Sequence, residues 1–242
     1  MISDQGEFMK YRIDKAVFEI LPNVCAGTIC VRGVDNRRYY PSIEKLLNES
    51  IAACEKAYEN IKIKEDPEIS YYRDAFRSLG INPNKYMCSI EALISRIAKR
   101  KGMPSINPLV DLNNAISIKY ALPMGTHDLD TLKEDLIVRF ACPGDTFIPF
   151  GETEAEHPDE NELVYVSGNE VRTRRWTWRQ SEIGKITEDT CSVFFPIDGF
   201  TDINRERVIK ARDELAERIE EIFGAVPVTG YVDSSAPETN LD

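Results

Sequence analysis

The sequence predicts an α+β protein, because helical and strand-like patterns are partly segregated along the chain. Three helical patterns lie between residues 41 and 104, whereas five strand-like segments follow between residues 136 and 196. Strict alternation of the two would indicate a parallel α/β sheet instead. The 242 residues, 42% of them hydrophobic, are enough for one sizeable core. We therefore expect one domain over residues 1–225.

The first half of the chain is expected to form two strands and then four helices. The strands are separated by Pro22 and Asn23. The second helix stops at Gly80, and Gly102 and Pro104 end the third helix. Asp111 can cap a helix that follows it. These elements are strands at 15–21 and 24–32, and helices at 41–60, 71–79, from residue 89 to Gly102, and 111–120.

The second half is expected to be mainly strands, closed by one amphipathic helix. The residues 167–169, Ser-Gly-Asn, predict a tight hairpin turn, and the acidic run 152–162 predicts an exposed loop. From residue 226 the chain has little to bury, which predicts a mobile tail over 226–242. The strands are expected at 136–142, 146–150, 163–166, 171–178 and 191–196, and the helix at 204–223.

Composition limits the classes of function. The net charge of −11 argues against a protein that wraps itself in nucleic acid, because such binding neutralises phosphates with Lys and Arg. No apolar run approaches the roughly 20 residues of a membrane span, so no membrane partner is expected. Six scattered cysteines without a Cys-x-x-Cys pair predict reduced thiols in the cytoplasm. No motif for a metal or a cofactor is present, and none is expected.

Two basic islands interrupt the acidic chain. Residues 71–103 carry a local charge of +5 and residues 170–185 a local charge of +3. They suit a small, oriented nucleic-acid contact, although two solvated faces beside acidic neighbours are an equal alternative. As a strand, 172–178 would place Arg172, Arg174, Trp176 and Trp178 on one face, where they could stack on unpaired bases and hold phosphates; burial of the tryptophans in the core is favoured. The candidate nucleic-acid-binding residues are Arg96, Lys99, Arg100, Lys101, Arg174 and Arg175.

Two motifs resemble the B3/B4 region of the bacterial phenylalanyl-tRNA synthetase β subunit. The first runs from Ile106 and Asn107 through Val110, Asp111 and Asn114 to Pro123 and Asp128, in register with a helix start and a following loop of that region. The second ends in Thr187-Glu-Asp-Thr190, which places Glu182 on a glutamate that lines the editing pocket of the family. The resemblance covers residues 70–200, leaving residues 1–69 as an N-terminal extension, and implies a B3/B4-type fold of mixed sheets with flanking helices.

The resemblance also implies a set of site residues. Gly125 stands where the family has a loop histidine, and His127 follows two residues later. Gln180 and Ser181 replace two glycines before Glu182. The candidate catalytic residues are Glu182 and His127, and the candidate substrate-binding residues are Asn107, Gly125, Thr126, Gln180 and Ser181.

The chemistry of three of these side chains can be argued directly. Asp128 and Asp130 beside His127 would raise the pKa of its imidazole and suit acid–base work, although an ordinary loop histidine is the commoner case. Glu182 could pair with a substrate ammonium group or lie exposed on the surface. We expect Asn107, His127 and Glu182 to border one pocket, because both motifs flank the same pocket in the synthetase.

The function implied by the resemblance is related to tRNA. In the synthetase the region removes a wrongly attached amino acid from tRNA, so a free-standing copy is expected to hydrolyse mischarged aminoacyl-tRNA in trans. The alternative is a non-catalytic module that binds tRNA, an aminoacyl-tRNA synthetase or a small ligand in the former editing pocket. Neither case is a complete aminoacyl-tRNA ligase, because no adenylation motif is present.

Overall fold

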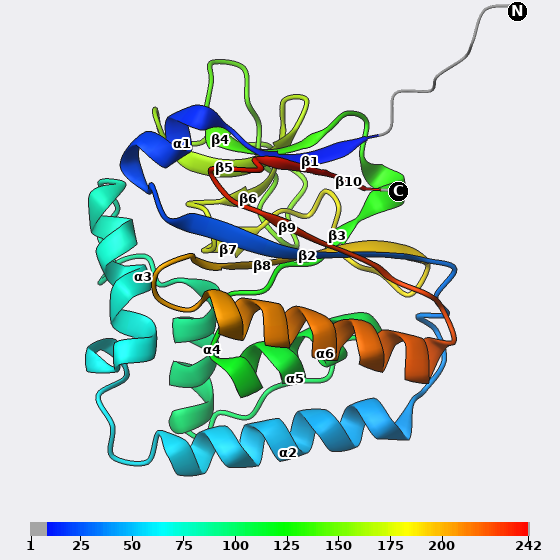
Figure 1. Ribbon diagram of the computed structural model, residues 1–242. Coiled ribbons are helices and arrows are strands. Elements are labelled where there is room, and N and C mark those ends of the chain that lie inside the picture. The colour runs from blue at the N-terminus through cyan, green and yellow to red at the C-terminus, as the bar shows by residue number, and fades with distance from the viewer. Residues whose placement is uncertain (1–8, 242) are drawn as a thin grey trace, which may run out of the picture.

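Two stacked β-sheets and a layer of helices beneath them make up the protein (Figure 1). The computed structural model describes residues 9–241. The six-stranded sheet has the order β10 (Glu238–Asn240), β1 (Lys10–Ile13), β4 (Leu136–Phe140), β5 (Leu163–Ser167), β6 (Glu170–Arg174) and β7 (Arg179–Gln180). The four-stranded sheet has the order β3 (His127–Asp128), β8 (Ser192–Phe200), β2 (Val24–Arg32) and β9 (Val228–Val232).

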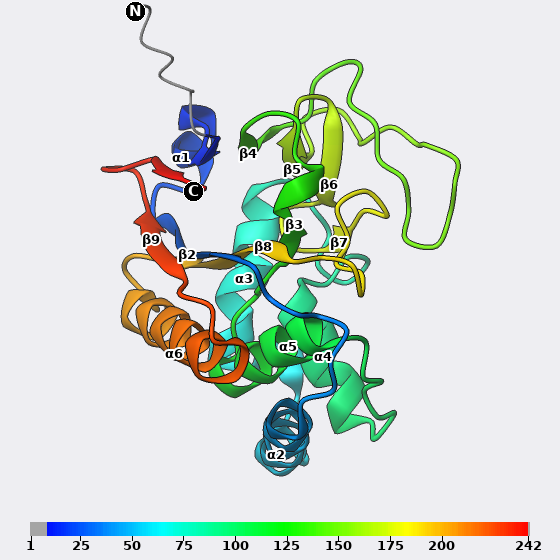
Figure 2. The same cartoon turned by 90° about the vertical axis from the view of Figure 1, so that its right-hand side faces the viewer.

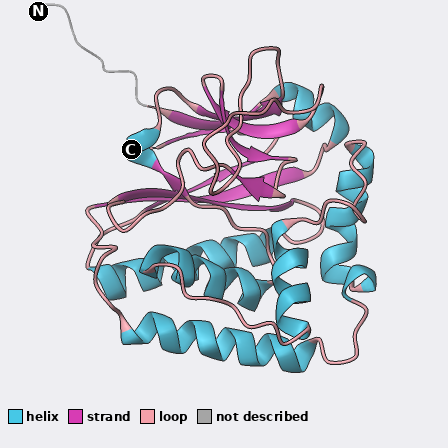
Figure 3. Cartoon of the chain, turned by 180° about the vertical axis from the view of Figure 1, so that it is seen from behind, coloured by secondary structure: helices cyan, strands magenta, loops and turns pink. Residues whose placement is uncertain are grey.

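The helices gather mainly on one side of the four-stranded sheet, as Figure 3 shows from behind. They are α1 (Lys15–Ile20), α2 (Pro41–Ala57), α3 (Pro67–Ser78), α4 (Ser89–Ala98), α5 (Pro108–Tyr120) and α6 (Arg205–Phe223), with short 3-10 turns at Ile63–Glu65 and Leu129–Thr131. Segregated helices and a mixed pairing of strands, in which only β1 and β4 run parallel among the named pairs of the described chain, make the fold α+β as expected. No helix within residues 9–241 is long and apolar enough to cross a membrane.

The four-stranded sheet forms the middle layer. All nine residues of β8 are buried, because one face of this strand meets the six-stranded sheet and the other meets the helices. Phe194 belongs to the core between the sheets, with Tyr11 and Tyr165, whereas its neighbour Phe195 packs toward the helices. The successive side chains of a strand point to opposite faces, so this one strand serves two cores.

Two segments near the ends of the chain differ from the structure that the sequence predicts. Residues 15–20 form α1 rather than a strand, because Asp14 caps the helix by accepting a hydrogen bond from the Ala16 N–H. The segment 226–242 is not a mobile tail over its described length. β9 pairs with β2 and β10 pairs with β1, both antiparallel, so the tail closes an edge of each sheet.

Two of the expected strands in the middle of the chain also differ. Residues 146–150 make only isolated bridges, and the strand expected over 171–178 ends at Arg174. The long β4–β5 loop, which holds the acidic run, projects from the six-stranded sheet (Figure 2). The hairpin turn at 167–169 connects β5 and β6 as expected, with Gly168 at a φ of +61°.

Candidate functional site

A small pocket lies between the two sheets, beside the N-terminal end of α4. Its free volume is about 100 Å³, so it suits a small group or the end of a larger ligand. Its walls come from the start of α4, the loop before β3, and strands of both sheets. The lining residues are Ser89, Pro123, Met124, Gly125, His127, Tyr165, Thr173, Trp176, Thr177, Trp178, Arg179, Gln180, Pro196 and Asp198.

His127 forms one wall of this pocket with an unpartnered imidazole. The ring is 1% exposed and stacks on Tyr165 at a centroid distance of 5.5 Å. Its Nδ1 has no hydrogen-bond partner within residues 9–241. Burial, and secondarily the nearby Arg172 guanidinium, lowers the pKa of His127 to about 3. The imidazole is therefore neutral at physiological pH.

The expectation that neighbouring carboxylates would raise the pKa of His127 is thus wrong. Asp128 is turned to its own loop, where its Oδ1 accepts a hydrogen bond from the Asp130 N–H and its Oδ2 accepts one from the Thr190 hydroxyl. These bonds commit the Asp128 carboxylate to holding the β3 loop. Burial of the imidazole therefore determines the pKa of His127 and lowers it.

Asp198 on β8 brings a buried carboxyl group to the same pocket. Its Oδ1 accepts hydrogen bonds from the Tyr165 hydroxyl at 2.7 Å and from the Trp176 Nε1–H at 2.8 Å. Burial raises the pKa of Asp198 to about 7, and the two hydrogen bonds limit the rise. A carboxyl group that titrates near neutrality in a pocket is a frequent mark of a functional site.

The turn after β6 carries the aromatic part of the pocket wall. Arg175 and Trp176 both have positive φ, 46° and 59°, a conformation that side chains other than Gly seldom adopt. The Trp176 N–H donates to the Leu163 carbonyl at 2.7 Å, which holds the turn against β5. The next residue, Thr177, is 7% exposed, and its hydroxyl has no hydrogen-bond partner in the described part of the chain. Strained turns of this kind often occur at functional sites.

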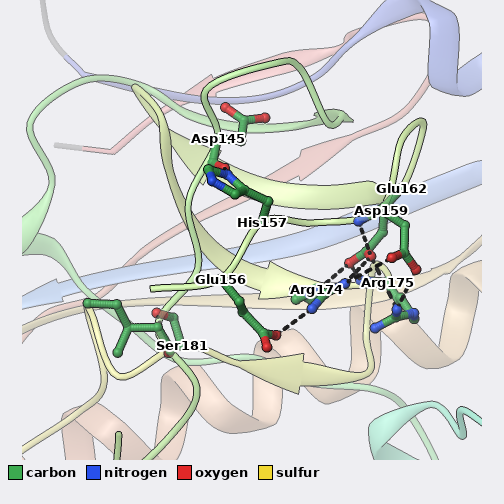
Figure 4. Close-up of polar contacts among 9 residues, drawn as sticks. Asp145, Glu156, His157, Asp159, Glu162, Arg174, Arg175 and Ser181 are labelled. Atoms are coloured by element: carbon green, nitrogen blue, oxygen red, sulfur yellow. Dashed lines mark hydrogen bonds and ion pairs between the residues drawn. The ribbon is translucent and has the colours of Figure 1, made fainter. Parts of the chain in front are cut away.

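An ion-pair cluster anchors that turn to the β4–β5 loop (Figure 4). Arg174 binds both carboxylate oxygens of Glu162, at 2.8 and 2.7 Å. Arg174 also pairs with Glu156 and Asp159, and Arg175 pairs with Asp159 and Glu162. Arg174 and Arg175 are almost completely buried and neutralised by these carboxylates. They are therefore structural and do not form the exposed cationic surface that the sequence analysis expected of them.

A second buried ion pair fixes the start of α4 at the pocket. The Arg73 Nη1 lies 2.5 Å from the Glu91 Oε1, and both side chains are about 5% exposed or less. Arg73 also donates to the Pro83 carbonyl and to the Asn84 side chain. The Ser89 N–H donates to the Thr177 carbonyl at 2.8 Å, which joins α4 directly to the aromatic turn.

Comparison with known families places most of this arrangement in one domain. A family model described as the B3/4 domain matches residues 71–224, more than half of the chain. The chain belongs to the B3/4 domain family. The match includes the loop before β3, the aromatic turn and β8, and so every segment that lines the pocket.

The chain also matches a solved structure of low sequence similarity. It is an N-terminal fragment of the phenylalanyl-tRNA synthetase β-subunit from Pyrococcus horikoshii, 13% identical, with a TM-score of 0.47 over 91% of this chain and 52% of that chain. The B3/4 protein thus spans about half the length of that fragment. No curated protein matches the chain.

Three of the residues expected at the site line the pocket of the B3/4 domain. They are Gly125, His127 and Gln180. The Gln180 side-chain amide donates to the Thr126 carbonyl at 2.5 Å, so Thr126, itself buried, supports the pocket wall. The loop before β3 and the strand β7 are thus brought together, as the two motifs predicted.

Two of the expected substrate-binding residues, Asn107 and Ser181, lie apart from this pocket. Asn107 caps α5 by accepting from the Val110 N–H and lines a separate cavity near Asn36. Asp111, expected to be the cap, instead accepts a hydrogen bond from the Ile106 N–H. Ser181 is buried and donates to the Ile148 carbonyl. Asn107 and His127 therefore do not border one pocket.

Glu182 does not line the pocket either. Its carboxylate pairs with Lys185 and accepts a hydrogen bond from the Gly151 N–H, and these two contacts lower its pKa. The interactions hold Glu182 on the loop after β7, toward the β4–β5 loop. The expected three-residue site of Asn107, His127 and Glu182 is thus not assembled.

The main residue that the sequence analysis missed is Asp198. The signal for it was present, because Asp198 follows the apolar run from Val193 to Ile197. A carboxylate at an inward position of a buried strand needs a partner or a function. Ser89 and Thr177 were missed because neither belongs to a motif of its own.

Proposed function

We propose that this B3/4 protein binds the aminoacyl end of mischarged tRNA and hydrolyses the ester bond in trans. The observation that carries the proposal is the neutral, unpartnered imidazole of His127 in a small pocket that the family-matched segments build. A buried polar nitrogen without a partner is rare in proteins and destabilises the fold, so its retention at a cavity favours a ligand that satisfies it.

The chemistry asked of the protein is modest, because an aminoacyl ester is already activated. A water molecule attacks the ester carbonyl carbon, the bond from that carbon to the ribose oxygen breaks, and the ribose oxygen takes up the proton that the attacking water gives up. The His127 imidazole accepts a hydrogen bond from the attacking water and fixes its position. With its pKa near 3 it orients the water rather than storing the proton.

The tRNA would approach along α4, whose two ends differ in character. Ser89 at its N-terminal end lines the pocket, whereas Arg96, Lys99, Arg100 and Lys101 lie exposed at its C-terminal end. None of these four forms an ion pair with the described residues. Ten residues of helix span about 15 Å. That separation suits phosphates a few nucleotides away from an aminoacyl group held in the pocket.

Changing Lys99, Arg100 and Lys101 together to Ala is expected to weaken tRNA binding and to flatten its dependence on salt. Loss of three phosphate contacts to a single strand lowers the slope of log K against log salt by roughly 2. Affinity would be measured by filter binding across salt concentrations. A matched triple change of Lys15, Lys45 and Lys64 to Ala is the control. Equal effects of the two triple variants on tRNA affinity would show that the C-terminal end of α4 is not part of the tRNA-binding surface.

The hydrolysis itself is tested with a panel of mischarged tRNAs. The wild-type protein should release the amino acid from at least one of them faster than buffer and leave correctly charged tRNAs intact. Release of labelled amino acid over time is the measurement. If none is hydrolysed while the tRNAs still bind, the protein is a binding module and the hydrolytic proposal fails.

A further inference from the structure

The second oxygen of the Asp198 carboxylate, Oδ2, has no hydrogen-bond partner among the described residues. Oδ1 holds Tyr165 and Trp176, whereas residues 9–241 provide no hydrogen bond to Oδ2. No Lys or Arg of the described chain forms an ion pair with Asp198, although its side chain is 3% exposed. Buried carboxylates in proteins are normally paired with a cation. The pocket therefore has an unmet preference for a positive charge.

The surroundings of Oδ2 specify what kind of cation fits. The unpartnered hydroxyl of Thr177 in the same pocket can accept a hydrogen bond, while the acceptor nitrogen of His127 remains for the attacking water. An ammonium group has three donors and is small, which suits one carboxylate oxygen with one neutral acceptor. Tyr165, Trp176 and Trp178 add aromatic faces that attract a cation. No group of three or more metal-binding side chains occurs within residues 9–241.

We propose that Asp198 binds the free α-ammonium group of the aminoacyl substrate, and that this substrate has a small, uncharged side chain. The inference rests on the proposed function, which places an aminoacyl group in the pocket. The volume of about 100 Å³ leaves little room beyond the ammonium and the carbonyl groups. Pro123, Met124 and Pro196 provide apolar walls for a side chain of a few atoms. Aminoacyl esters with an acylated nitrogen are excluded, because they carry no charge for Asp198.

The chain offers a direct measurement of this binding. Both of its two tryptophans, Trp176 and Trp178, line the pocket, so intrinsic tryptophan fluorescence reports occupancy at this site alone. L-Alaninamide is the probe, because its amide replaces the ester and is not hydrolysed. Propionamide lacks the ammonium group, N-acetyl-L-alaninamide blocks it, and L-phenylalaninamide enlarges the side chain.

We expect L-alaninamide to bind at least about tenfold more tightly than the other three amides. Asp198→Asn retains an oxygen for Tyr165 and Trp176 and should lose that preference, since a charge-assisted contact contributes about ten- to a hundredfold in affinity. Asp202→Asn, the same change at an exposed residue four positions later, should retain it. Circular dichroism confirms that each variant is folded.

The outcomes separate this inference from the proposed hydrolysis. Equal binding of L-alaninamide and propionamide to the wild-type protein overturns the assignment of Asp198, whether or not a tRNA is deacylated. A preference for the small ammonium ligand without deacylation of any tRNA supports the ammonium site and rejects the hydrolytic function. Tighter binding of L-phenylalaninamide would overturn the limit on side-chain size. The comparison of the four amides on the wild-type protein tests the proposal even if the Asp198→Asn variant does not fold.

Discussion

If the protein hydrolyses mischarged tRNA as proposed, substitution of His127 by Phe should slow this deacylation by about a hundredfold while leaving the fold intact. Phe retains the stacking on Tyr165 but removes both ring nitrogens, so the attacking water loses the acceptor that positions it. Misplacement of a reacting group by about 1 Å is enough for a rate loss of this size. The measurement is the single-turnover rate on the tRNA that the wild-type protein hydrolyses fastest.

The same variant should be at least as stable as the wild type, and increasingly so in acid. The pKa of His127 is about 3 in the folded protein and near 6.5 when unfolded. Below pH 6.5 the unfolded chain therefore binds a proton that the folded chain does not, and wild-type stability falls with falling pH. Phe removes this loss, which amounts to about 2 kcal/mol at pH 5.

Urea unfolding at pH 5 and pH 8 tests the stability of the His127→Phe variant, and His157→Phe is the control. His157 is exposed and lies on the β4–β5 loop, so its replacement should leave the deacylation rate unchanged. A rate that is unaffected by His127→Phe would show that the imidazole does not orient the water. A variant that loses activity together with stability would show that His127 mainly supports the core.

Substitution of Arg73 by Met should destabilise the protein by about 3–5 kcal/mol at pH 8, because it leaves the Glu91 carboxylate buried without its cation. Burial already raises the pKa of Glu91 despite the contact with Arg73. Without Arg73 the folded state holds a proton on Glu91 up to still higher pH than the unfolded state does. Stability of the variant relative to the wild type therefore recovers as pH falls.

Replacing both partners distinguishes a charge effect from a packing effect. Arg73→Met combined with Glu91→Met should recover most of the lost stability, because no unpaired charge remains. Chemical unfolding of the wild type, the single variant and the double variant from pH 5 to pH 8 is the measurement. A double variant as unstable as the single one would mean that the hydrogen bonds of Arg73 to Pro83 and Asn84 carry the effect.

Patterns of apolar residues predicted most of the helices and the longer strands. Segments whose secondary structure depends on pairing with a strand far away in the sequence could not be predicted. The helix at 41–57 and the final helix follow from their periodicity alone. The strands β9 and β10 do not, because their pattern is weak and they become strands by pairing with β2 and β1. The strand after Glu170 ends early because the Arg174–Glu162 pair and two residues of positive φ bend the chain.

The site was predictable only in part for a similar reason. Motif order indicated that the loop before β3 and the strand β7 would meet, and His127 and Gln180 do line one pocket. The protonation of His127 depends on burial beside Arg172, which no local sequence pattern reveals. Asp198 carries no motif, and its importance follows from a strand buried on both faces.

The pairing of the first strands with the last ones has a consequence for how the chain folds. β1 pairs with β10 across some 230 residues, Lys10 with Asn240, and β2 pairs with β8 and β9. The chain loses conformational entropy when such long loops close, before the strand contacts stabilise the fold. Folding is therefore expected in the millisecond-to-second range rather than in microseconds. During synthesis on the ribosome, β1 and β2 are made long before the strands with which they pair. Their apolar strand edges stay exposed until those strands have been made. Protection by a chaperone during synthesis is therefore of more use to this chain than to a helical bundle of equal length.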